Sequence, residues 1–216
     1  MIETLPAVRH DLPGWTLFWA RWRLRPHDPA ALARVFAAGQ AAARGSWTLE
    51  TLAQQPTVAA VRALFRQAGC DPTRYRPSSE ALLRRVLKGD DLPPIHPAVD
   101  VNNLLSIALA VPACVVDPER VTPPLVLRVG RAGERMQSMR GDFDLAGKPL
   151  LEDAEGPFGT PITDSERVKI RPGVADVVLV AYLPTACDLE AEARATLRRL
   201  LDATGVGSLV ADGVTV

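Results

Sequence analysis

The chain has 216 residues, of which 47% are hydrophobic and 23% are charged, and its 25 basic and 25 acidic side chains cancel. These values exclude a wholly disordered chain. A net charge of zero argues against a nonspecific nucleic-acid binder, because such proteins are usually basic overall. The three cysteines form no CxxC pair, so neither a zinc site nor a disulfide framework is indicated. No apolar run is long enough to cross a membrane and no leader is evident, so we expect a cytoplasmic protein with reduced thiols and no metal or other cofactor.

The first sixty residues predict one strand and two helical regions. Residues 15–24, WTLFWARWRL, alternate in the manner of a strand. A helix follows, with Asp28 as its N-cap and Gly45 beyond its end. A second helical region spans residues 49–68 and is interrupted at Pro56.

Two further helices are predicted in the first half of the chain. The segment RPSSEALLRRVLKG has Ser78 as a plausible N-cap, and Glu80 and Arg84 have the spacing of an i,i+4 ion pair. The next helix is expected to begin after Asp100, as its N-cap, and to continue through Ala110.

The second half of the chain is rich in strands. Strands are predicted at PPLVLRVG, ERMQSM, KPLLEDA, VADVVLVAYLP and, weakly, VGSLVADGVTV. One amphipathic helix, CDLEAEARATLRRLLDATG, precedes the last of them. This order predicts an α+β fold with a mixed, mostly antiparallel or barrel-like central sheet and flanking helices.

Two stretches carry polar groups that suggest a binding site. Asn102 and Asn103 lie in an apolar helix, where they either serve the helix terminus or face a cavity. Successive helical side chains diverge by about 100°, so at most one of them faces a given pocket. The loop 152–170 is broken by glycine and proline and is dense in hydroxyls and carboxylates. Long irregular loops of this kind are often functional, although a solvated surface loop explains the composition equally well.

A histidine and a cysteine flank the apolar helix. His96 is most simply explained as a histidine whose ring is satisfied by the backbone of a turn. A nucleophilic role for Cys114 would need a base and a polarised environment, and the flanking VPACVVD offers neither. We therefore expect Cys114 to be a small buried apolar residue.

An ordered set of short motifs extends over about residues 60 to 185. It contains RPSSEALLRR, LPPIHPAVDVNN, an apolar helix, PACVVD, then LVLRVGRAGERM and LLEDAEGPFGTPITDSERVKI. This order resembles the freestanding relatives of the B-three/B-four domain in the phenylalanyl-tRNA synthetase beta subunit, whose pattern includes R-P-S-x-E-A-L-x-R-R and L-P-x-I-N-P-x-V-D-x-x-N. The resemblance implies the fold of that domain over residues 61–216, with residues 1–60 as an extension packed on the core in one compact unit.

The resemblance also implies a tRNA-editing site. In the synthetase this domain hydrolyses tyrosine wrongly esterified to the phenylalanine tRNA. A site that hydrogen-bonds the phenol hydroxyl discriminates strongly against the analogue that lacks it. The motifs map candidate catalytic roles onto Glu166, Asn103 and His96, and candidate substrate-binding roles onto Asn102, Gly159, Thr160 and Cys114.

Cys114 leaves two hypotheses for the function open, because the synthetase has a histidine in the segment equivalent to VPACVVD. Our first hypothesis is a freestanding domain that hydrolyses a mischarged aminoacyl-tRNA in trans, with His96 as the replacement histidine. The alternative is a noncatalytic binder of RNA or an amino acid that has lost hydrolysis. An unrelated hydrolase based on Cys114 has little support, and a complete tRNA ligase is excluded because nothing resembles an ATP-binding core.

The expected partners are an aminoacyl-tRNA or other RNA and its amino acid moiety, without a membrane. The best basic cluster for RNA consists of Arg74, Arg76, Arg84, Arg85 and Lys88. The alternative explanation for this cluster is a solvated helix face.

Overall fold

Residues 8–215 are described by the computed structural model of the chain. Its helices are α1 (Pro29–Ser46), α2 (Pro56–Gln67), α3 (Ser78–Leu87), α4 (Pro97–Leu109) and α5 (Glu190–Thr204). Its strands are β1 (Val8–His10), β2 (Trp15–Leu24), β3 (Ala113–Val116), β4 (Leu125–Val129), β5 (Arg135–Ser138), β6 (Gly141–Asp144), β7 (Pro149–Asp153), β8 (Gly156–Gly159), β9 (Asp176–Pro184) and β10 (Gly207–Thr215). Within these residues, no helix is long and apolar enough to cross a membrane.

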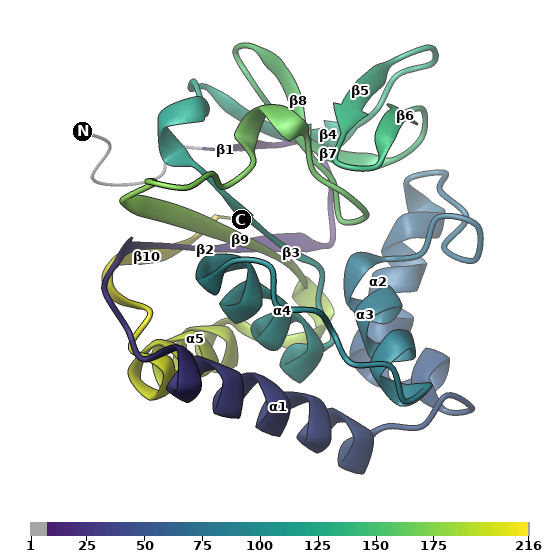
Figure 1. Ribbon diagram of the computed structural model, residues 1–216. Coiled ribbons are helices and arrows are strands. Elements are labelled where there is room, and N and C mark those ends of the chain that lie inside the picture. Colours follow the sequence, from purple (N-terminus) through teal and green to yellow (C-terminus); the bar gives the residue numbers. More distant parts are fainter. Residues whose placement is uncertain (1–7, 216) are drawn as a thin grey trace.

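The molecule is built in layers around one sheet, as Figure 1 shows. This central sheet has the order β10-β2-β9-β3 and is antiparallel throughout. Helices α4 and α5 cover one of its faces, and α1 packs across them. A second sheet, β1-β4-β7-β8, covers the other face, and its β1–β4 pair is parallel. The predicted α+β fold with a mixed, mostly antiparallel sheet is confirmed, and neither sheet closes into a barrel among the described strands.

Strand β2 is central because its two faces are both apolar. Phe18, Ala20 and Trp22 pack against α4 and α5, whereas Trp15 and Leu17 face the second sheet. Its neighbours are β9 on one side and β10 on the other. The segment predicted as an N-terminal extension therefore supplies a middle strand of the central sheet, and its residues 1–7 lie outside the described residues.

Several helix ends differ from the prediction by a few residues. Gly45 lies inside α1, and Pro56 begins α2 instead of interrupting a longer helix. This fits the tolerance of the first helical turn for proline, whose missing N–H has no partner there in any case. Asp28 does cap α1 as predicted, accepting a hydrogen bond from the backbone N–H of Ala30 at 2.9 Å.

Helix α4 begins one turn earlier than predicted. Its N-cap is His96, whose ring Nδ1 accepts a hydrogen bond from the backbone N–H of Ala98 at 3.2 Å. Asp100, predicted as the cap, is buried inside the first turn, and its carboxylate accepts from the N–H of Ile95 at 2.9 Å. The helix start is thus fixed by His96, which accepts from the first turn, and by Asp100, which reaches back to the chain before the helix.

Glu80 anchors α3 through an ion pair other than the predicted one. The side chain is buried, and its two carboxylate oxygens lie 3.1 and 2.9 Å from Nη1 of Arg62 on α2. Arg76 approaches the same carboxylate at 3.6 Å. The predicted pair with Arg84 is not formed among the described residues, because the carboxylate points inward to α2.

We predict that Glu80→Ala lowers the free energy of unfolding by roughly 3 kcal/mol, because it leaves the guanidinium of Arg62 buried without its partner. Chemical denaturation of the variant measures this change. The control is Asp90→Ala, which removes an exposed carboxylate just after the same helix and should change the free energy by less than about 0.5 kcal/mol. Equal effects of the two substitutions would contradict an anchoring role for Glu80.

Candidate functional site

A small group of polar atoms surrounds Gly159 between the two sheets. A methyl group placed on Gly159 would lie 3.3 Å from Oδ1 of Asp164, 3.5 Å from the hydroxyl of Tyr182 and 3.9 Å from Sγ of Cys114. The contact with Asp164 would be tight, whereas the other two would be ordinary van der Waals contacts. We call Cys114, Gly159, Asp164 and Tyr182 the Gly159 cluster.

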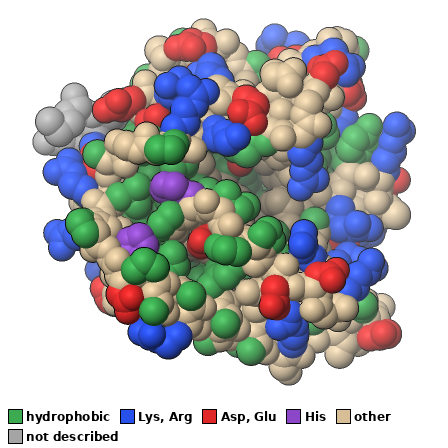
Figure 2. Space-filling model, in the orientation of Figure 1, with side chains coloured by type: hydrophobic (Ala, Val, Ile, Leu, Met, Phe, Trp, Pro, Cys, Tyr) green, Lys and Arg blue, Asp and Glu red, His purple; other side chains and the backbone are tan. Residues whose placement is uncertain are grey.

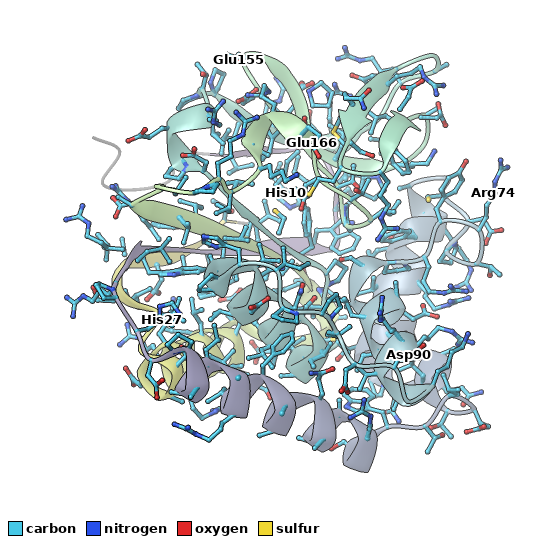
Figure 3. The ribbon with its side chains drawn as sticks, in the orientation of Figure 1. His10, His27, Arg74, Asp90, Glu155 and Glu166 are labelled. Atoms are coloured by element: carbon cyan, nitrogen blue, oxygen red, sulfur yellow. The ribbon has the colours of Figure 1, made fainter. Side chains whose placement is uncertain are left out.

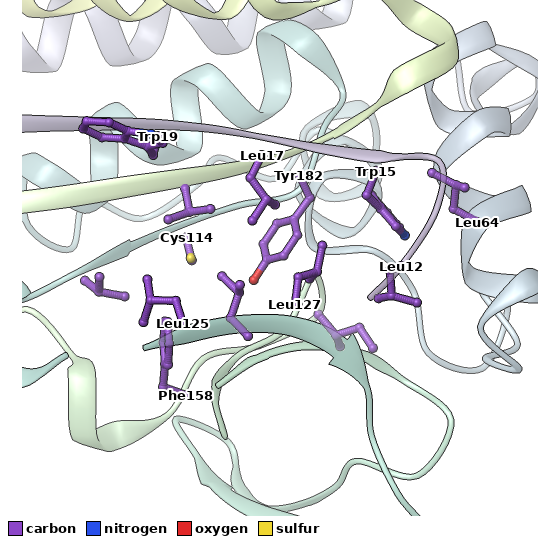
Figure 4. Packing of buried hydrophobic residues seen from close by; sticks show 14 of the residues in the cluster. Leu12, Trp15, Leu17, Trp19, Leu64, Cys114, Leu125, Leu127, Phe158 and Tyr182 are labelled. Carbon is purple, nitrogen blue, oxygen red and sulfur yellow. The ribbon is translucent and has the colours of Figure 1, made fainter. Parts of the chain in front are cut away.

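Two strands of the central sheet supply the thiol and the phenol. Cys114 on β3 pairs with Val180 on β9, and the N–H of Tyr182 donates to the carbonyl of Pro112 at 2.9 Å. Figure 4 shows both side chains in the apolar layer between the sheets, near Leu125 and Phe158. The register of β3 on β9 thus brings the two polar groups to one place.

The loop after β8 supplies Asp164 and folds back on its own strand. Thr160 organises the turn, because its hydroxyl donates to the carbonyl of Thr163 at 2.7 Å and accepts from the N–H of Ile162. The N–H of Ser165 then donates to the carbonyl of Phe158 at 2.8 Å. Thr160 is consequently used inside the loop, where it fixes the position of Asp164.

Burial dominates the electrostatics of the cluster. It raises the pKa of Asp164 to about 7, against a smaller opposing effect of the Thr160 backbone. Burial also raises the pKa of Cys114 and of Tyr182 well above their ordinary values, and the neighbouring Asp164 carboxyl adds to both effects. The thiol is therefore neutral, which agrees with the expectation that Cys114 is not a nucleophile.

The cluster contains polar atoms without hydrogen-bond partners. Oδ1 of Asp164 and the hydroxyl of Tyr182 are both enclosed and unpartnered. The phenol interacts electrostatically with the Cys114 thiol, but it forms no well-aligned hydrogen bond with it. Unpaired buried polar atoms cost free energy, so their retention requires an explanation.

The two asparagines of α4 lie beside this region and are both buried. Nδ2 of Asn102 donates to the carbonyl of Ala113 at 3.3 Å, which ties α4 to the residue before Cys114. Oδ1 of Asn102 is enclosed and has no partner. The amide of Asn103 makes no hydrogen bond with any described residue. The helix therefore offers amide atoms that protein groups do not fully satisfy.

Glu166 and His96 are used elsewhere. The Glu166 side chain is 42% exposed and pairs with Lys169 at 3.3 Å. In Figure 3 it lies in the strand-rich part of the molecule. Nδ1 of His96 accepts the capping hydrogen bond of α4, and burial lowers the pKa of the His96 ring. Within residues 8–215, neither side chain hydrogen-bonds to the Gly159 cluster.

The predicted basic cluster is partly neutralised. Arg76 pairs with Glu80, and Nε of Arg85 donates to the backbone carbonyl of Asp91 at 3.2 Å. Arg74, Arg85 and Lys88 are exposed, whereas Arg84 is half-buried. Figure 2 shows basic and acidic side chains interspersed over the visible face, which suits a solvated surface.

Sequence reasoning did not single out Asp164 and Tyr182. Asp164 stands in the loop that its composition marked as unusual, two residues before Glu166. Tyr182 is the one hydroxyl-bearing residue in VADVVLVAYLP, and a phenol in an otherwise apolar strand was a signal for it. Metal chemistry gains no support, since the described residues contain no group of three His, Cys, Asp or Glu side chains that could hold a metal.

We predict that Asp164→Asn removes a pH dependence of stability. The folded-state pKa near 7 exceeds the unfolded value of 3.8, so the protonated carboxyl is favoured by folding. Its contribution is complete below about pH 4 and is lost as the pH rises through 7, by an amount on the order of 2–4 kcal/mol. Thermal and chemical unfolding of both proteins between pH 4 and 8 measure the difference. Parallel stability curves of the two proteins would show that Asp164 ionises in an ordinary environment.

Comparisons with known proteins agree on the type of domain. The B3/4 domain family matches residues 60–208 of the chain. An N-terminal fragment of the phenylalanyl-tRNA synthetase beta-subunit from Pyrococcus horikoshii has a similar fold, with a TM-score of 0.51 and 12% sequence identity. The similarity covers 99% of this chain and 55% of that fragment, so the chain spans about half of its length.

Two other comparisons add no argument. The TilS C-terminal domain is 26% identical over 34% of this chain and 70% of its own, but its TM-score is only 0.29. No curated protein matches the chain. The family match alone covers more than half of the sequence, and the chain therefore belongs to the B3/4 domain family.

Proposed function

We propose that this B3/4 domain binds the aminoacyl end of a mischarged tRNA and hydrolyses its ester in trans, in the cytoplasm. The observation that carries the proposal is the set of enclosed, unpartnered oxygens of Asn102, Asp164 and Tyr182. Asn102 and Asp164 occur on the helix and loop to which the family pattern assigns the site, and Tyr182 on β9 lies close to Gly159 together with Asp164. A polar ligand that pairs with such atoms would recover the cost of leaving them unsatisfied.

Ester hydrolysis needs a positioned water, a proton acceptor and donors for the developing oxyanion. In our proposal the amides of Asn102 and Asn103 hold the acyl group, and the backbone at Gly159 faces the carbonyl. Glu166 reads a hydroxyl or ammonium of the substrate from the edge of the loop. Thr160 contributes by fixing that loop, because its hydroxyl is already bonded within it.

His96 is the weakest of the proposed catalytic residues. Its Nδ1 accepts a hydrogen bond from the helix, so the neutral ring carries its proton on Nε2. Such a ring can donate from Nε2 but cannot accept a proton from water without giving up the cap. A role as general base would thus compete with the start of α4.

A noncatalytic binding domain is the second candidate, and Cys114 is the observation that favours it. The thiol stands where the resembling synthetase domain has a histidine, and it is buried with a raised pKa. It supplies neither a base nor a thiolate at neutral pH. The same unpaired oxygens would then serve recognition of an amino acid or RNA without hydrolysis.

The decisive test is a deacylation assay over a panel of mischarged tRNAs. We expect one aminoacyl ester to be hydrolysed, and Asn103→Ala and Glu166→Ala each to lower kcat/KM by about 10-fold or more, which corresponds to about 1.4 kcal/mol. The control is Glu119→Ala, which removes an exposed carboxylate. Absence of hydrolysis for every ester would leave the binding function, and unchanged rates in both variants would move the site elsewhere.

RNA binding by the α3 region makes a separate prediction. Reversing the exposed charges of Arg74, Arg85 and Lys88 to glutamate should weaken tRNA binding and flatten its salt dependence, because each phosphate contact releases counterions. A matched triple reversal of Arg25, Arg34 and Arg131 tests whether net charge alone explains the loss. Equal losses in the two triples, measured by filter binding at several salt concentrations, would rule out a specific α3 surface.

A further inference from the structure

Asp164 is a buried carboxyl group without a cation. Its Oδ1 is enclosed and has no hydrogen-bond partner. None of the described Lys, Arg or His side chains forms an ion pair with it. Other buried carboxylates of this protein do have such partners: Glu80 pairs with Arg62, and Asp153 pairs with Arg167 at 2.7 Å. Asp100 is also buried without such a cation, but the backbone N–H of Ile95 donates to its carboxylate. Oδ1 of Asp164 has neither a cation nor a donor among the described residues.

The polar groups around Asp164 indicate that the partner it lacks is a hydrogen-bond donor. Apart from the Thr160 backbone, the polar atoms around it include the phenol oxygen of Tyr182 and the sulfur of Cys114, both close to the point where a Gly159 side chain would begin. A carboxylate and a phenol oxygen both accept hydrogen bonds, while a thiol donates only weakly. The cluster is thus rich in acceptors, and it contains no positive charge of its own.

A primary ammonium satisfies this environment better than a hydroxyl. An ammonium has three donors and one positive charge in a compact group, so it compensates the buried anion and pairs with the phenol oxygen. A hydroxyl provides one donor and leaves the carboxylate charge uncompensated, which is costly away from water. Asp164 is partly buried as a residue, while its Oδ1 is enclosed within the cluster.

We propose that the Gly159 cluster is an ammonium subsite, in which Asp164 and Tyr182 bind the α-amino group of an aminoacyl ligand. The identity of this amine rests on the proposed function, whereas the subsite itself rests on the cluster. Asp164 then binds the amine, and Glu166, which is half-exposed and paired with Lys169, is left to read a hydroxyl of the substrate. A side chain at position 159 would approach Asp164 and Tyr182, so we expect it to hinder the amine.

Ligand binding at this subsite is linked to protons. An ammonium holds Asp164 in its ionised form, so a proton leaves the carboxyl for solvent when the ligand binds below about pH 7. The titratable groups that face Asp164 are Cys114 from β3 and Tyr182 from β9, and both stay neutral in this range. Gly159 on β8 and Met139, whose N–H donates to the Asp164 carbonyl, bring no charge.

The test compares ligands that differ only in the amine. Calorimetry on the full chain at pH 7 would use adenosine carrying a tyrosyl group through a stable 3′ amide, and its counterpart without the amino group. Tyrosinamide and 3-(4-hydroxyphenyl)propanamide form a second pair without the nucleoside. We expect the amine to bind about tenfold or more tightly than its counterpart, and Asp164→Asn to abolish that preference.

Two further variants distinguish loss of the subsite from loss of folding. Glu119→Gln, which alters an exposed carboxylate outside the cluster, should keep the preference for the amine. Gly159→Ala should weaken amine binding while its circular dichroism remains that of the wild type. A preference that persists in Asp164→Asn, or equal binding of both nucleoside ligands to the wild type, would overturn the subsite and leave the proposed function standing. Binding of tyrosinamide through Asp164 without binding of either nucleoside would support the subsite and refute the tRNA function. Failure of all four ligands to bind would refute the subsite, and the deacylation panel would then decide on the proposed function.

Discussion

The central sheet has no face left for water, and the rest of the fold depends on this constraint. Strands β2 and β9 lie in its middle, with helices on one face and the second sheet on the other. A sheet buried on both faces has to be apolar on both, and β2 meets this requirement with tryptophans and aliphatic residues on alternate sides. Every polar atom that enters these layers must then be paired or left at a cost, which is why the Gly159 cluster stands out from its surroundings.

Local patterns in the sequence predicted most of the helices and strands. The alternation of WTLFWARWRL correctly predicted a strand, but alternation does not say whether the second face meets solvent or a second sheet. The predicted N-cap of α4, Asp100, was wrong. His96 and Asp100 lie four residues apart, and either could stand at the start of a helix. Only the burial of Asp100 inside the first turn decides between them. Glu80 was assigned to a neighbour in its own helix, since the competing Arg62 lies on another helix and is invisible to local spacing.

The site residues named from the sequence remain predictions. The motif order singled out α4 and the loop 152–170, and two of the named residues, Cys114 and Gly159, lie close together in the structure. Asp164 and Tyr182, which lie beside them, were not singled out. Their meeting depends on the register of β3 and β9 and on the fold of the loop around Thr160. Long-range register of this kind follows from tertiary packing, so one sequence without a structure does not disclose it. The roles of Glu166, Asn103 and His96 remain predictions.

The position of β2 also bears on how the protein reaches its native state. Arg23 on β2 and its partner Asp176 on β9 are 153 residues apart, and the other neighbour, β10, comes later still. Contacts of such high sequence separation are reached late, because the intervening chain must first lose its freedom. During synthesis this tryptophan-rich strand emerges well before β9 and β10, so until then it lacks both of its neighbours in the sheet. Its tryptophan-rich surface is therefore the part of the nascent protein most in need of shielding from aggregation.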